Sequence, residues 1–73
     1  INNTNIIFYS DSDQHIQIHA YDLNGRLLEV IMKTKVTKGY QEINWSTDLP
    51  AGIYILKLLT NDSAHSLRIL KAE

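Results

Sequence analysis

Three histidines are the side chains with the most evident capacity for chemistry. His15 and His19 are four residues apart, and His65 lies much further along the chain. In a strand, two metal-binding histidines need positions i and i+2, which are about 7 Å apart at about 3.3 Å per residue. A spacing of four places two histidines roughly 13 Å apart, too far for one ion. We therefore interpret all three as solvated strand residues and predict neither a metal site nor a cofactor.

Other polar clusters also fall short of a reactive site. Asp11-Ser12-Asp13 has the acidic spacing of a calcium-loop opening, but the glycine and the distant glutamate of such a loop are missing. The serines lack a nucleophile elbow, and no glycine-rich loop is present to hold phosphate. Because a small sandwich has little room for a concave pocket, we predict that the chain is not an enzyme and takes no small-molecule substrate.

Aromatic residues and charge restrict the binding functions. Tyr40, Trp45 and Tyr54 have rings that are able to stack on sugars or bases, but we interpret them as core anchors. A formal net charge of −1 argues against nucleic-acid binding. We interpret the basic stripe of Lys33, Lys35 and Lys38 as a solvated face. The 73 residues contain no cysteine and no run of about 20 apolar residues, so we expect neither a disulfide nor a membrane span.

Alternation of apolar and polar residues predicts the elements that position these side chains. The pattern predicts strands over residues 5–9, 14–21, 27–36, 40–45, 53–60 and 66–71. Within the third strand, Leu28, Val30 and Met32 are expected on one face with Thr34 and Val36. Glu29, Lys33 and Lys35 are expected on the opposite face. The fifth strand is nearly all apolar, which indicates a central strand covered on both faces.

Turn residues separate these strands and favour one all-β fold. Asn24-Gly25 predicts a hairpin, because both residues tolerate positive φ, and 48–52 marks a later turn. Tyr54 follows that turn, as in the tyrosine corner of Greek-key sandwiches, and its hydroxyl is expected to bond backbone near 48–50. We predict a small immunoglobulin-like antiparallel β-sandwich with a Greek-key topology and about six or seven strands.

Three motifs together resemble the C-terminal sorting domain of type IX secretion cargo proteins from Bacteroidota. They are the hairpin Tyr21-Asp22-Leu23-Asn24-Gly25-Arg26-Leu27-Leu28, the corner Leu49-Pro50-Ala51-Gly52-Ile53-Tyr54-Ile55-Leu56-Lys57 and the terminal strand Leu67-Arg68-Ile69-Leu70-Lys71. The family pattern carries over to Asp22, Gly25, Gly52, Tyr54 and Lys71, and Pro50 is a further motif residue of the corner. The terminal residues Arg68, Ile69, Leu70 and Lys71 are the candidates for the sorting signal.

The resemblance implies a non-catalytic secretion signal. It implies export through the periplasm and across the outer membrane to the cell surface or the medium. The implied partners are the outer-membrane type IX translocon and a sortase-like peptidase that removes the domain. The terminal strand is the best candidate for pairing with a partner sheet, with Arg68 and Lys71 steering it toward an acidic groove. An exposed edge strand would also permit a weak homodimer.

Two other classes of function remain open from the sequence. One is an immunoglobulin-like accessory or carbohydrate-binding module of a secreted enzyme, and the other is a flagellar hook-capping domain with a similar corner motif. The position of Glu73 as a chain end favours the sorting interpretation. Family members commonly begin with a Tyr-Pro-Asn-Pro segment that this sequence lacks. We therefore expect 1–73 to be a single C-terminal sorting domain without its first few residues.

Overall fold

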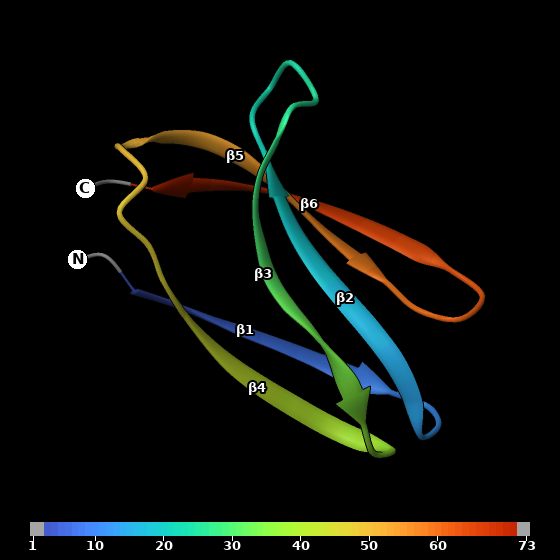
Figure 1. The fold of residues 1–73 in the computed structure, drawn as a ribbon. Helices are drawn as coiled ribbons and strands as arrows, with labels where there is room; N and C mark the ends of the chain where they lie inside the picture. Colours follow the sequence, from blue (N-terminus) through green and yellow to red (C-terminus); the bar gives the residue numbers. More distant parts are fainter. Residues whose placement is uncertain (1–2, 72–73) are drawn as a thin grey trace.

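The computed structural model describes residues 3–71, which form six strands and no helix (Figure 1). None of these residues belongs to a helix able to cross a membrane. Each strand overlaps one of the ranges expected from the alternation pattern. The strands are β1 (Asn3–Ser10), β2 (Gln14–Tyr21), β3 (Leu27–Val36), β4 (Gly39–Ser46), β5 (Gly52–Leu59) and β6 (Ala64–Lys71).

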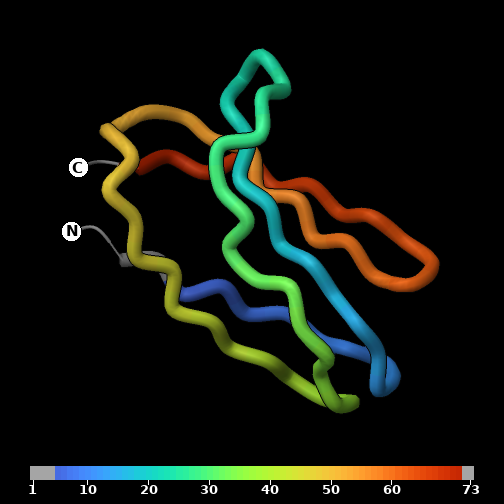
Figure 2. The backbone as a smooth tube through the Cα atoms, viewed as in Figure 1, coloured from blue at the N-terminus to red at the C-terminus, as the bar shows by residue number. Residues whose placement is uncertain are grey.

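The strands form two antiparallel sheets. β1 pairs with β4, and the other four strands lie in the order β3-β2-β5-β6. The path of the tube in Figure 2 passes between the sheets after β1, β3 and β4. The two sheets correspond to the B–E pair and the C′-C-F-G order of immunoglobulin variable-type domains. The expected small immunoglobulin-like antiparallel sandwich is therefore confirmed.

The core lies between the sheets and consists of two connected clusters. Ile16, Ile18 and Val36 form the first cluster. Ala20, Trp45 and Leu56 form the second. Ile6 from β1 and Ile31 from β3 pack against both clusters, so they join them into one apolar layer. The expected inward face of β2, which carries Ile16, Ile18 and Ala20, is thus confirmed.

A β-bulge in β3 overturns part of the predicted alternation. Ile18 pairs with Met32, but His19 pairs with Val30, so Ile31 has no direct partner on β2. The extra residue lets both Ile31 and Met32 face the core. On the N-terminal side of the bulge, the inward and outward positions of β3 are exchanged relative to the prediction, because a shift of one residue exchanges the two faces of a strand. The prediction was therefore wrong for Leu28 and Val30, which are exposed.

β5 is central in its sheet, as predicted, because it lies between β2 and β6. Its inward face carries the buried side chains of Tyr54 and Leu56. The opposite face is only partly covered, since Ile53 is exposed and Ile55 is half-buried. The expectation of two covered faces was therefore wrong. The apolar sequence of β5 reflects cross-strand contacts on an open sheet face as well as burial.

Candidate recognition site

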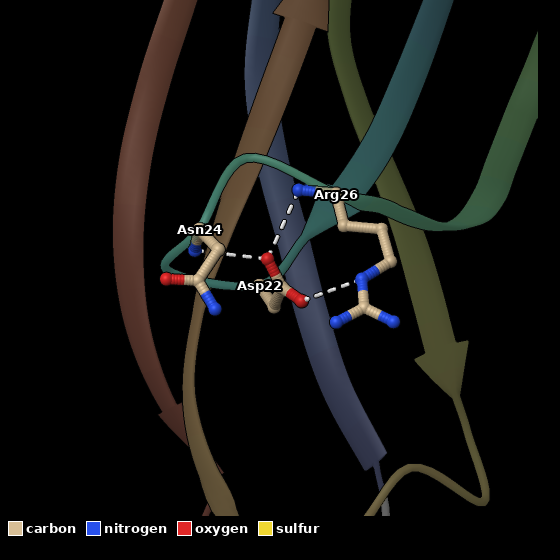
Figure 3. Close-up of polar contacts among 3 residues, drawn as sticks. All are labelled: Asp22, Asn24 and Arg26. Atoms are coloured by element: carbon tan, nitrogen blue, oxygen red, sulfur yellow. Dashed lines mark hydrogen bonds and ion pairs between the residues drawn. The ribbon is translucent and has the colours of Figure 1, made fainter.

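The first sequence motif builds the turn between β2 and β3. The Asp22 carboxylate accepts the backbone N–H groups of Asn24 and Arg26 at 2.9 Å each, and its other oxygen lies 3.3 Å from Arg26 Nε (Figure 3). The backbone N–H of Gly25 donates to the Asp22 carbonyl at 3.1 Å. Asp22 therefore closes a turn that would otherwise leave two N–H groups with no protein partner.

Only one residue of this turn has a positive φ. Gly25 has φ of 84°, a conformation that glycine adopts without a Cβ clash. No non-glycine residue among 3–71 has a positive φ, so in this turn only Gly25 uses the left-handed region that both residues tolerate. Asp22 and Arg26 are joined by a backbone hydrogen bond of 3.1 Å and enclose a three-residue hairpin loop with glycine in the left-handed position. The hairpin itself is confirmed.

The second motif builds the predicted tyrosine corner. Tyr54 is buried at the start of β5, and its hydroxyl donates a hydrogen bond to the backbone carbonyl of Pro50. Gly52 lies directly beneath this ring, because a Cβ at residue 52 would be 3.7 Å from the Tyr54 hydroxyl oxygen. Asp22, Gly25, Pro50, Gly52 and Tyr54 therefore have identifiable roles in the architecture of the fold.

Glu29 has a structural role that the sequence pattern did not predict. The β3 bulge turns Glu29 toward the core beside Ala20, its partner on β2. Its two carboxylate oxygens accept hydrogen bonds from Trp45 Nε1 at 3.0 Å and from the Thr47 hydroxyl at 2.9 Å. This carboxylate therefore links the two sheets. The missed signal is a lone acidic residue within an otherwise apolar half-strand.

The aromatic side chains do not form a common platform. Trp45 and Tyr54 are buried, which confirms their interpretation as core anchors. Tyr40 is 80% exposed, so that interpretation was wrong for this residue. It packs edge-to-face on Tyr9, with ring centroids 5.1 Å apart. Because Tyr9 and Tyr40 are opposite one another on β1 and β4, this is a cross-strand pair on the outside of the smaller sheet.

The histidines and the acidic turn are dispersed over the structure. His15 and His65 are exposed, whereas His19 is half-buried and bonds Gln17 and Tyr21. Asp13 accepts the backbone N–H of Lys38 at 2.8 Å and so connects two turns. Within residues 3–71, no group of three or more His, Cys, Asp or Glu side chains is arranged to hold a metal ion.

The terminal motif forms β6, the edge strand of the four-stranded sheet. Its register with β5 places Arg68 and Leu70 on the outer face, where both are exposed. Ile69 and Lys71 face inward beside the tyrosine corner. Lys71 is only 9% exposed. Arg68 is therefore accessible to a partner, whereas Lys71 is largely buried.

An apolar groove separates the β6 edge from β1. Leu67 points toward the smaller sheet but is still 62% exposed, because β1 does not cover it. The groove has a volume of about 150 Å³. Its apolar lining comes from β1, β2, β5 and β6 and consists of Ile6, Ile7, Phe8, Ile18, Leu56, Leu58 and Leu67. An open backbone edge and an apolar groove therefore occur side by side.

The fold and this edge define a small β-sandwich module whose two internal motifs build its turns. A family model described as a secretion system C-terminal sorting domain matches residues 2–72, essentially the whole chain. The chain therefore belongs to the family of type IX secretion C-terminal sorting domains, and the resemblance seen in the motifs is confirmed. Comparison with the curated proteins and with the solved structures found no match.

Proposed function

We propose that the type IX machinery reads this domain through the β6 edge and the groove beside it. Membership in the sorting-domain family identifies a secretion signal of an exported protein. The observation that favours β6 is its unpaired edge together with Leu67, a large apolar side chain exposed at the groove. A partner strand that pairs with β6 would gain main-chain hydrogen bonds, and its alternate side chains would enter the groove.

The same proposal covers the later steps of export. The domain crosses the periplasm folded, engages the outer-membrane translocon and directs its cargo to the cell surface or the medium. A sortase-like peptidase then removes the domain from the cargo. Arg68 lies on the same strand, exposed on the outer face, and is placed to pair with an acidic partner. The domain contributes recognition surfaces to this process and no catalytic group.

An export assay with a matched pair of variants tests this proposal. The domain is fused behind a signal peptide and a fluorescent reporter in a type IX-competent host. Leu67→Lys places a charge at the groove and blocks strand addition, because inward-pointing lysines disfavour edge pairing. Leu23→Lys is the control, since Leu23 is 55% exposed in the β2–β3 turn, far from the groove. Circular dichroism verifies that both variants fold.

We expect the unchanged domain to carry the reporter out of the cell. The Leu67→Lys variant should leave the reporter in the periplasm. The control variant is exported like the unchanged domain, and a translocon-deficient strain exports none of them. Export of Leu67→Lys at the unchanged level would show that another surface is read. Retention of the unchanged, folded domain in the periplasm would refute the sorting function itself.

A further inference from the structure

The outer face of the four-stranded sheet carries an unequal distribution of charge. The strand registers place Lys33 and Lys35 of β3, Lys57 of β5 and Arg68 of β6 on this face. These are four of the seven lysines and arginines in the chain. Among residues 3–71, no aspartate or glutamate of these strands shares the face, because Glu29 points into the core. A chain with a net charge of −1 therefore has one strongly basic face.

Exposed apolar side chains share this face with the cations and extend beyond Arg68 toward the tyrosine corner. Leu70 is 75% exposed and pairs with Ile53, which is also exposed. At the centre of the face, the Lys57 ammonium lies 5.0 Å from the centroid of the Tyr21 ring. Tyr21 also hydrogen-bonds His19, which is held in turn by Gln17. The centre is therefore ordered before any partner binds, which lowers the entropy cost of association.

We propose that this outer face docks on an acidic protein surface of the export machinery, an inference that rests on the proposed sorting function. Cations, tyrosine and exposed aliphatic side chains are the mixture that protein interfaces use, and opposite charge supplies orientation. Polybasic membrane sites instead concentrate about four to eight cations in a single cluster. Here the four cations are spread over three strands and share the face with exposed apolar residues.

The outer face adjoins the β6 edge, so the two surfaces act together. A strand added to β6 continues the sheet, and the body of the same partner then lies next to Arg68 and Lys57 on the outer face. Docking of the face on an acidic surface would set the direction of approach before the strand pairs. Electrostatic attraction acts at longer range than main-chain hydrogen bonds and raises the rate of encounter.

Neutralising two exposed cations tests the face without touching β6. Lys33→Gln/Lys35→Gln removes two positive charges from the face, and Arg26→Gln/Lys38→Gln removes the same number from exposed positions outside it. In the export assay we expect the face variant to lower the external reporter about fivefold, as for two lost ion pairs. The control should stay within about twofold. Export of the face variant at the control level would overturn the proposal while leaving the sorting function intact.

Photo-crosslinking identifies the partner and also applies if the unchanged domain is not exported. A photoreactive residue is placed at Ser66, which lies on the outer face opposite Lys57, or at Glu42 on the other sheet as a control. The expected product is a protein adduct from position 66 only, mapped by mass spectrometry to an acidic segment and lost with Lys33→Gln/Lys35→Gln. Absence of this adduct overturns the proposal. So does Lys33- and Lys35-dependent binding to phosphatidylglycerol–phosphatidylethanolamine vesicles, which would identify a membrane site.

Discussion

At the scale of single residues, side chains of the first two family motifs form hydrogen bonds that close a turn and a corner. Asp22 holds two backbone N–H groups, and the Tyr54 hydroxyl holds the Pro50 carbonyl. Buried or turn-closing polar contacts of this kind help to specify one native structure, because the loss of one partner leaves the other polar group without a hydrogen bond.

Replacing Tyr54 by phenylalanine removes only the hydroxyl that reaches Pro50. We expect Tyr54→Phe to lower the free energy of unfolding by about 1 kcal/mol, the usual net value of one hydrogen bond. Urea unfolding followed by circular dichroism measures the change. Tyr40→Phe is the control and should leave the unfolding midpoint unchanged, because its ring is on the surface. Equal effects of the two substitutions would argue against the corner.

Replacing Glu29 by glutamine removes the negative charge that accepts both of its hydrogen bonds. The amide oxygen still accepts from Trp45 Nε1, but the amide nitrogen is a donor, so the Thr47 hydroxyl must reverse from donor to acceptor and both bonds become neutral and weaker. We expect Glu29→Gln to destabilise the fold by about 1–3 kcal/mol. Glu42→Gln, which changes an exposed glutamate, should have no measurable effect in the same urea titration. A stable Glu29→Gln domain would show that the carboxylate link is dispensable.

At the scale of elements, β6 is an edge strand that leaves both its outer backbone edge and an inward apolar side chain open to solvent. It pairs on one side with β5 only, and its inward Leu67 remains exposed. Natural sheets commonly protect such edges with charges or bulges, because an open edge pairs with other chains. Arg68 protects this strand from its outer face, but within residues 3–71 no aspartate, glutamate, lysine or arginine lines the groove at Leu67.

An open β6 edge predicts weak self-association of the purified domain. We expect the sedimentation coefficient to rise with protein concentration, because two β6 strands are able to pair antiparallel across a two-fold axis. Leu67→Lys should remain monomeric over the same concentrations, whereas Leu23→Lys should behave like the unchanged domain. A concentration-independent sedimentation coefficient for the unchanged domain would contradict this prediction.

Much of the fold follows from local sequence, and the exceptions share one cause. The Asp22–Gly25 turn and the Tyr54 corner were predictable because their partners lie within four residues. The inward position of Glu29 was not, because it depends on where β3 slips against β2. The burial of Lys71 likewise depends on its register opposite Gly52. Strand registers are tertiary properties that a period-two pattern does not determine.

At the scale of the whole molecule, Ile6 and Ile31 connect the two core clusters into one unit. Such a connection predicts a single cooperative transition in which fluorescence of Trp45 and far-ultraviolet circular dichroism change together. We expect Ile31→Ala to destabilise the domain by about 2–4 kcal/mol, as for other large-to-small core changes. Ile7→Ala, at a position that is 64% exposed, should cost far less. Separate transitions for the two probes would show that the clusters unfold independently.

The pairing of the first and last strands has a mechanical consequence. Asn3 pairs with Ser46 and Lys71 pairs with Gly52, and only residues 47–51 separate those two partners along the chain. Both ends of the domain therefore emerge from the same end of the sandwich (Figure 1). A pulling force applied between the two ends acts across the strands. It therefore breaks the hydrogen-bonded residue pairs one after another, starting from that end of the sandwich. A pull between the start of β1 and the end of β6 would thus load one terminal strand pair of each sheet at a time, instead of all pairs together.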